Sequence, residues 1–228
     1  MSDHHGCEGC CTWDYDFQRT WRDACGVFGI QAPGTEDLAR LCYFGLFALQ
    51  HRGQESAGIA VGNAGGIDVY TGMGLANEVF NDEIIQRLQG DVALGHVRYS
   101  TTGSNVIENA QPFVGEHRSG MFAVAHNGNL VNALPLRQEL LARGVRFEAT
   151  SDTEVITQLI ANSSQERLED AIAEAMLRMQ GAYSLGIIAP DRLIAVRDPH
   201  GVRPLCVGRL NGDQWGIASE TWALHVIG

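Results

Sequence analysis

The chain has 228 residues, of which 45% are hydrophobic and 19% charged, the balance of a globular protein. Its formal net charge is −11, which argues against nucleic-acid binding because that needs clustered cations. No run approaches the roughly 18 apolar residues of a membrane-spanning helix, and the N-terminus lacks the apolar core of a signal peptide. We therefore expect a cytoplasmic protein with reduced cysteines, no membrane contact and no nucleic-acid partner.

All 16 basic side chains are arginines, since the sequence contains no lysine. This excludes Schiff-base chemistry on a lysine and a phosphate-binding loop that depends on one. A carboxylate on a ligand would have to be held by arginine, whose planar guanidinium can bind it with two parallel hydrogen bonds.

Residues 1–24 differ from the rest of the chain. A cluster of histidines and cysteines stands within eight positions: His4, His5, Cys7, Cys10 and Cys11. The Cys7-x-x-Cys10 spacing is that of metal ligands, but no second ligand pair follows at the spacing of a zinc site. We therefore favour a flexible leader over a metal site, and we expect no metal site in the chain.

From Cys25 onward, apolar runs alternate with turn signals. The first half predicts strands over 25–30, 56–61, 67–72, 92–100 and 121–128, and helices over 36–50 and 81–89. The second and third of these strands are joined by a glycine-rich turn, which is typical of a hairpin.

The second half predicts three helices and then four strands. The first helix, over 135–144, opens with a proline and closes with a glycine. Two capping boxes predict the starts of the others: Ser151-x-x-Glu154 and Ser163-x-x-Glu166. The strands are expected over 183–189, 192–198, 203–210 and 215–219, the last two joined by a tight Asn211-Gly212 turn. Short turns between most strands and separate runs of helices favour an α+β layered architecture over a parallel βαβ one.

Cys25 is the candidate nucleophile, and it needs a base because a free thiol has a pKa of about 8.5. None of the histidines after it stands in a recognisable Cys–His signature. If the chain were cut before Cys25, the new α-amino group, with a pKa of about 7.7–8.0, would be a base on the same residue. Residues 1–24 would then be a propeptide that keeps the thiol inactive until it is removed.

Five motifs occur in the order found in one enzyme family: CGVFGI, LQHRGQESAGIA, GHVRYSTTG, HNGNLVN and SDTE. Through these motifs, residues 25 to about 225 resemble the glutaminase domain of the amidophosphoribosyltransferases, which belongs to the N-terminal-nucleophile hydrolases. Related glutamine amidotransferases have corresponding motifs in the same order but with different residues in them. The resemblance implies a four-layer αββα sandwich and the hydrolysis of glutamine to glutamate and ammonia.

The resemblance also assigns roles to particular residues. It implies that Cys25 attacks the side-chain amide of glutamine to form a thioester, and that Asn127 and Gly128 form the oxyanion hole. It implies that Arg98 binds the α-carboxylate and Asp152 the α-ammonium, which would select a free amino acid over a peptide. The remaining residues would line or close the pocket: Arg52, Gly53 and Thr101.

Each residue also has a purely structural interpretation: a core thiol for Cys25, an ion pair for Arg98, a helix cap for Asp152 and a turn for Asn127-Gly128. Taken singly, the aspartate and the asparagine favour that interpretation. Together and in this order, the motifs favour the enzyme. We assign His126 a structural role, place Cys42 and Cys206 in the core, and give His51, His96 and His200 no role.

Full-length members of the family carry a second half, a phosphoribosyltransferase that transfers the ammonia to phosphoribosyl pyrophosphate in the first step of purine synthesis. That half binds Mg²⁺ and, in some members, a 4Fe–4S cluster. This chain has no Asp-Asp pair and no room for that fold, so we expect a leader over 1–24, a glutaminase domain over 25–228, and no cofactor. The end at HVIG resembles an interrupted sequence, and we expect the full-length form to be a homo-oligomer.

Two alternatives stay open at this point. The chain could be a glutamine amidotransferase domain that serves a different acceptor, or a non-catalytic regulatory fragment. The intact set of Cys25, Arg98, Asn127 and Asp152 favours an enzyme over the second alternative.

Overall fold

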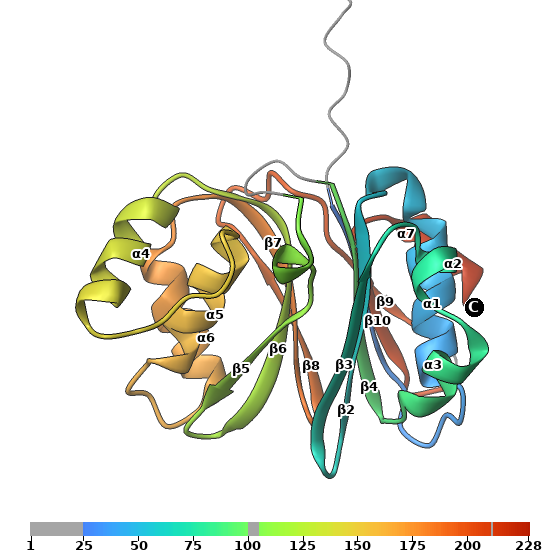
Figure 1. The fold of residues 1–228 in the computed structure, drawn as a ribbon. Coiled ribbons are helices and arrows are strands. Elements are labelled where there is room, and N and C mark those ends of the chain that lie inside the picture. The colour runs from blue at the N-terminus through green and yellow to red at the C-terminus, as the bar shows by residue number, and fades with distance from the viewer. Residues whose placement is uncertain (1–24, 100–104, 211) are drawn as a thin grey trace, which may run out of the picture.

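The structure is a computed structural model that describes residues 25–99, 105–210 and 212–228. Two antiparallel sheets face each other in the middle of the molecule, and helices cover the outer face of each sheet (Figure 1). The order of the layers is therefore helix, sheet, sheet, helix. This confirms the α+β, four-layer αββα sandwich that the sequence motifs imply.

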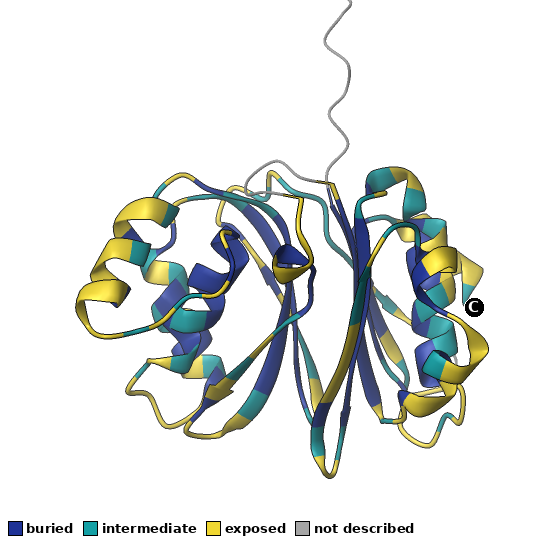
Figure 2. Cartoon of the chain, in the orientation of Figure 1, coloured by how far each residue is buried: buried dark blue, intermediate teal, exposed yellow. Residues whose placement is uncertain are grey.

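The first sheet has six strands in the order β3-β2-β4-β1-β10-β9. They are β1 (Gly26–Gln31), β2 (Ser56–Asn63), β3 (Gly66–Met73), β4 (Val92–Arg98), β9 (Cys206–Arg209) and β10 (Trp215–Ala218). β1 lies inside this sheet, between β4 and β10, and spans about 20 Å at the usual rise per residue. Helices pack on one face of β1 and strands of the second sheet pack on the other, which explains why it is apolar from Gly26 to Ile30. Buried residues gather where the layers meet (Figure 2).

The second sheet has four strands in the order β5-β6-β7-β8. They are β5 (Phe113–His117), β6 (Gly120–Leu130), β7 (Gly181–Ala189) and β8 (Arg192–Arg197). The sequence pattern does not predict β5, because this short edge strand carries a glycine and a glutamate and is only partly buried. β6 pairs with β7 from Ala123 to Leu130, so the HNGN motif lies inside the sheet.

The helices form the two outer layers. Over the six-stranded sheet lie α1 (Leu38–Ala48), α2 (Ala76–Val79), α3 (Asp82–Arg87) and α7 (Thr221–Val226), with the short 3-10 turn η1 (Gln50–Arg52) after α1. Over the four-stranded sheet lie α4 (Ala133–Ala142), α5 (Asp152–Ala161) and α6 (Leu168–Arg178), and η2 (Ile107–Asn109) precedes β5. Within the described part of the chain, no helix combines the length and the apolar composition needed to cross a membrane.

Three clusters of buried apolar residues fill the spaces between the layers. Cys42 is fully buried in the cluster under α1, as expected, and burial raises the pKa of its thiol. Met176 and Met179 pack against the cluster under α6, so the methionines of this helix belong to the core. Cys206 is only partly buried on β9, which corrects its assignment to the core, because β9 is an edge strand.

The first predicted capping box is half right. Ser151 is the N-cap of α5, and its hydroxyl accepts a hydrogen bond from the Thr153 N–H at 3.2 Å. The carboxylate of Glu154 does not return the bond. It accepts the N–H groups of Glu148 and Ala149 instead, both at 2.8 Å, and so holds the loop before the helix.

The second predicted capping box is wrong. α6 begins at Leu168, and its N-cap, Arg167, makes no side-chain capping bond. Glu166 forms an ion pair with Arg118, and the Ser163 hydroxyl donates to Glu174. Both side chains that the pattern assigned to the start of the helix are thus bound elsewhere, Glu166 to Arg118 and Ser163 to Glu174 within α6.

Three further predictions can be compared with the structure. The helix predicted from Pro135 begins earlier: α4 starts at Ala133, which places Pro135 inside the first turn, where a missing N–H costs nothing. The chain closes with α7 after the last strand, a helix too short to show a period in the sequence. The predicted tight turn joins β9 to β10, with Gly212 at a φ of 67°, while Asn211 lies outside the described residues.

Candidate active site

Cys25 directly precedes β1, at the end of the strand that lies against β4 and β10. It is 9% exposed, and its Sγ donates to the Tyr99 carbonyl at 3.4 Å. Burial raises the pKa of the Cys25 thiol, whereas the Tyr99 hydrogen bond and the nearby Arg98 charge lower it. The effect of burial is the larger, so the pKa lies above its usual value. The thiol is therefore protonated near neutral pH while its nitrogen is part of a peptide bond, and it needs a base.

Arg98 ends β4, one position beyond the residue that pairs with the start of β1. Its side chain is 3% exposed, and its guanidinium contacts the Glu55 carboxylate at 3.5 Å. The charges of Arg98 and Asp152 both act on the thiol of Cys25, in opposite directions. The structure thus brings together the predicted nucleophile and the two predicted binding groups.

Asp152 is the first residue of α5, and its side chain is 7% exposed. One carboxylate oxygen accepts the Leu130 N–H at 2.9 Å, and the other lies 3.5 Å from Nδ1 of His126. Burial alone would raise the pKa of Asp152, but the contacts with His126 and Leu130 outweigh it and hold that pKa below the usual value. The carboxylate of Asp152 therefore links the first turn of α5 to β6, while Ser151 caps the helix.

Asn127 and Gly128 lie on β6, next to a hydrogen bond that joins the two sheets: Nε2 of His96 on β4 contacts the His126 carbonyl at 3.1 Å. Asn127 is fully buried, and neither atom of its amide has a hydrogen-bond partner among the described residues. A buried amide without a partner is costly and needs an explanation. Gly128 has a φ of 152°, and a Cβ there would lie 2.1 Å from the Ala182 carbonyl oxygen, so only glycine fits.

Arg52 and Gly53 follow α1 and reach the same place. Nε of Arg52 donates to the Cys25 carbonyl at 3.2 Å, and Nη1 donates to Glu220 at 2.6 Å. A Cβ on Gly53 would lie within 2.7 Å of main-chain atoms of Arg98, so glycine permits this close approach. Arg52 therefore contacts the main chain of the nucleophile and Gly53 lies against Arg98, while their role in lining a glutamine pocket stays a prediction.

Two histidines that the sequence analysis considered also have contacts near the site. His126, given a structural role, binds Thr153 at 3.2 Å as well as Asp152. His51, given none, contacts Glu220, a residue that no sequence signal singled out. Thr101 and the leader over 1–24, with its histidines and cysteines, lie outside the described residues.

Comparisons with known proteins agree with this geometry. Residues 96–226 match a family described as glutamine amidotransferase domain. The chain is 52% identical to amidophosphoribosyltransferase of Synechococcus elongatus, an alignment that covers 90% of this chain and 43% of the relative. It is 47% identical to that of Methanocaldococcus jannaschii, with 89% and 43% covered. The chain thus spans about two fifths of the length of these relatives.

Solved structures show the same fold. Glutamine phosphoribosylpyrophosphate amidotransferase from B. subtilis, complexed with ADP and GMP, superposes with a TM-score of 0.82. It is 42% identical, and the match covers 90% of this chain and 44% of that one. The family match runs from β4 to α7 and includes Arg98, Asn127, Gly128 and Asp152. The chain therefore belongs to the glutamine amidotransferase domain family.

Proposed function

We propose that this chain hydrolyses glutamine to glutamate and ammonia with Cys25 as the nucleophile. The ammonia would go to phosphoribosyl pyrophosphate to give 5-phosphoribosylamine, the reaction expected of a protein related to the amidophosphoribosyltransferases. The observation that carries the proposal is a pair of buried opposite charges, Arg98 and Asp152, both within electrostatic reach of one thiol.

The pair of charges matches the two ends of a free amino acid. Arg98 would bind the α-carboxylate through two parallel hydrogen bonds, and Asp152 would accept the α-ammonium. Both groups are buried and have partners, Glu55 for Arg98 and His126 for Asp152, and a zwitterionic ligand would add a second opposite charge to each. A substrate bound in this way places its side-chain amide toward Cys25, with Gly53 and Arg52 lining the pocket.

The reaction needs a base that acts on a buried, protonated thiol. After cleavage before Cys25, its free α-amine would take the proton from Sγ, and Sγ would attack the amide carbon. The oxygen then carries a negative charge, which the Asn127 amide and the Gly128 N–H would stabilise. One such donor contributes about 2.7–4 kcal/mol in comparable sites.

The later steps return the proton and free the enzyme. The protonated α-amine would pass its proton to the leaving nitrogen, so that ammonia departs and a thioester joins the substrate to Cys25. The same amine would then take a proton from water as the water attacks the thioester. Glutamate leaves, and the thiol recovers its proton.

Removal of residues 1–24 is part of this proposal. An amide nitrogen cannot act as a base, so the precursor would be inactive. The raised pKa of the thiol supports the need for the amine that cleavage creates. Thr101 would belong to a loop that closes over bound glutamine.

Acceptor chemistry would belong to a phosphoribosyltransferase half, in this chain's full-length form or on a separate partner. Mg²⁺ and any 4Fe–4S cluster would bind in that half. We propose a cytoplasmic location and a homo-oligomeric full-length form. An amidotransferase with another acceptor is the alternative, because the residues proposed here would bind glutamine and none of them would contact the acceptor.

The test is glutamine-dependent ammonia release by the protein after its intact mass has shown the loss of residues 1–24, compared with a Cys25→Ala variant that begins at the same residue. We expect the substitution to lower the rate about a thousandfold or more, because it removes the nucleophile. Alanine fits the buried position, so the thermal unfolding midpoint should change little. Activity within tenfold of the unsubstituted protein would contradict the proposal.

A further inference from the structure

Glu220 lies in the junction between β10 and α7, at the position directly before the helix. An acidic residue there commonly caps its own helix, but Glu220 makes no side-chain capping bond. Its carboxylate instead lies 2.6 Å from Nη1 of Arg52 and 3.1 Å from Nε2 of His51. These hydrogen bonds hold the pKa of Glu220 below its usual value, although burial opposes them, so the group is ionised.

Arg52 connects Glu220 to the nucleophile. Its side chain is 15% exposed, and while Nη1 binds Glu220, Nε donates to the Cys25 carbonyl at 3.2 Å. A planar guanidinium that is held at one edge presents its other donors in a fixed direction. The position of the Cys25 carbonyl is therefore linked to Glu220 through one rigid group.

The junction itself is fixed to the same strand as the nucleophile. Ser219 accepts a hydrogen bond from the Val27 N–H through its hydroxyl, at 2.9 Å. The Ser219 N–H donates to the Val27 carbonyl, also at 2.9 Å. Glu220 thus starts from a main chain that is anchored two residues beyond Cys25, and its carboxylate has a defined place relative to β1.

This arrangement matters most if Cys25 becomes the first residue of the chain, which is part of the proposed function and on which this inference rests. A terminal residue has no preceding peptide unit to hold it and is poorly ordered unless it is tied down. The Arg52 hydrogen bond ties down its carbonyl, from the side opposite to the free amine. The thiol and the amine would then keep a constant orientation toward the substrate.

We propose that Glu220 is a positioning residue for Cys25: it holds Arg52, and Arg52 holds the main chain of the nucleophile. The substrate contacts of Arg98 and Asp152 do not involve Glu220. Arg52 only lines the pocket, whereas Arg98 and Asp152 are proposed to hold the charged ends of glutamine, so loss of the Glu220 charge should slow the chemical step more than it weakens glutamine binding. Misplacement of a reacting group by about 1 Å can cost up to about a hundredfold in rate.

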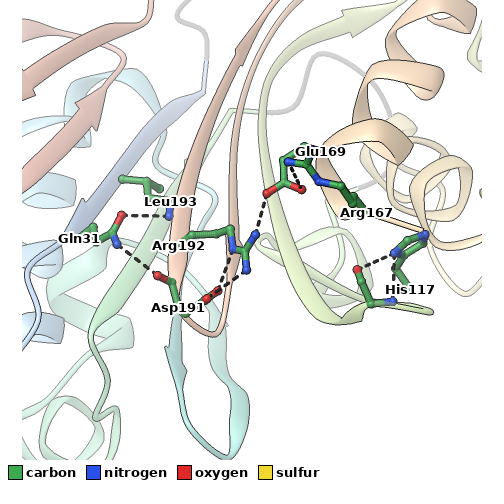
Figure 3. A network of polar contacts seen from close by, with 8 residues as sticks. Gln31, His117, Arg167, Glu169, Asp191, Arg192 and Leu193 are labelled. Carbon is green, nitrogen blue, oxygen red and sulfur yellow. Dashed lines mark hydrogen bonds and ion pairs between the residues drawn. The ribbon is translucent and has the colours of Figure 1, made fainter. Parts of the chain in front are cut away.

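The test compares Glu220→Gln with Glu169→Gln in the 228-residue chain. Both carboxylates are about one-third exposed, 33% and 34%, and both bind an arginine, at 2.6 and 2.7 Å. Glu169 lies beside Arg192 (Figure 3), in a network that contacts Gln31, at the end of β1 away from Cys25. We expect Glu220→Gln to lower kcat for glutamine hydrolysis about tenfold with KM within about twofold, and Glu169→Gln to change neither.

A second variant and a second readout separate positioning from stability. Glu220→Asp keeps the charge, so it should recover part of the lost kcat. A lower thermal midpoint with unchanged kcat in Glu220→Gln would overturn the proposal, and so would a rise in KM that accounts for the whole loss. If Glu220→Gln does not fold, an unchanged kcat in Glu220→Asp, His51→Gln and their combination would overturn it.

Failure of the proposed function is recognised separately. If the unsubstituted chain releases no ammonia from glutamine, the rate at which iodoacetamide modifies Cys25, mapped by peptide mass, replaces kcat. The positioning role predicts that Glu220→Gln alters this rate several-fold and that Glu169→Gln does not. Equal rates in both variants would overturn it.

Discussion

Charged side chains of the same kinds surround the two ends of β1, exposed to solvent at one end and buried at the other. At the Gln31 end, Arg192 pairs with Asp191 and Glu169 on the surface, with side chains 34–68% exposed (Figure 3). At the Cys25 end, the side chains of Arg98, Asp152 and Arg52 are 3%, 7% and 15% exposed. The same kinds of charge lie about 20 Å apart along one strand, one set in solvent and the other buried.

The difference in burial distinguishes an exposed network of ion pairs from a candidate active site. An exposed ion pair contributes about 0–1 kcal/mol and costs little to form, so the Arg192 network needs no functional explanation. Buried charges are costly unless a partner compensates them. At the Cys25 end, Arg98 pairs with Glu55 and Asp152 contacts His126, and these buried charges surround a thiol and an amide that has no partner among the described residues, which is the arrangement expected where a charged ligand binds.

The largest effect is expected from Asn127→Leu, which tests whether the buried amide serves the reaction. Removal of one oxyanion donor should lower kcat about 10²–10³-fold. The thermal midpoint should stay the same or rise, since the amide has no hydrogen-bond partner among the described residues and leucine has the same branched skeleton of four side-chain heavy atoms.

Asn109→Leu is the matched control for that change. Asn109 is also fully buried, but its amide exchanges hydrogen bonds with Thr150, at 2.8 and 2.9 Å. Leucine there should cost about 1–3 kcal/mol of folding free energy, measured by denaturant unfolding. The interpretation of Asn127 would be wrong if the two variants lost stability equally and Asn127→Leu kept its kcat.

A smaller effect on activity is expected from Arg98→Lys compared with Arg192→Lys. Lysine cannot form the two parallel bonds of a guanidinium, so KM for glutamine should rise about 10–100-fold in Arg98→Lys. Arg192→Lys, in the exposed network, should leave KM unchanged. Initial-rate kinetics measure both, and equal KM values would remove the distinction between the two ends of β1.

The smallest effect concerns pH, through His96, whose ring binds the His126 carbonyl between the sheets. Burial lowers the pKa of His96 to about 3, so the native protein keeps the ring neutral while the unfolded chain protonates it at about 6.5. Stability from the neutral ring is complete above about pH 6.5 and is lost toward pH 3. The slope should be at most about 1.4 kcal/mol per pH unit.

His96→Gln checks this slope, because glutamine keeps an N–H donor and does not titrate. The free energy of unfolding of the variant should depend less on pH between about 6.5 and 4, by close to one proton. Denaturant unfolding at several pH values measures it. An identical slope in both proteins would show that His96 does not remain neutral in the fold.

Local sequence patterns predicted most elements but not their arrangement. Period and turn signals reached α+β, whereas the four layers came from the family resemblance. The reason is that β1 pairs with β4 and β10, and no local pattern records a partner far along the chain. The second capping box failed for a related cause, since Arg118 and Glu174 lie outside the window in which such a box is read.

The candidate site was predictable where its residues belong to motifs. The sequence analysis found Cys25, Arg98, Asn127 and Asp152 in short motifs of the family. The structure brings these residues to one end of the sandwich. Glu220 was missed because an acid before a helix resembles an ordinary cap. Its partner, Arg52, is 168 residues away in the sequence, so only the fold reveals the contact.

The most direct test of the central claim is the intact mass of the purified protein after incubation with an electrophilic glutamine analogue. The account predicts loss of residues 1–24 and one adduct, which peptide mapping places on Cys25. A full-length mass without an adduct, under conditions in which glutamine is hydrolysed, would contradict it. Cys25 would then be neither the freed N-terminus nor the group that recognises glutamine.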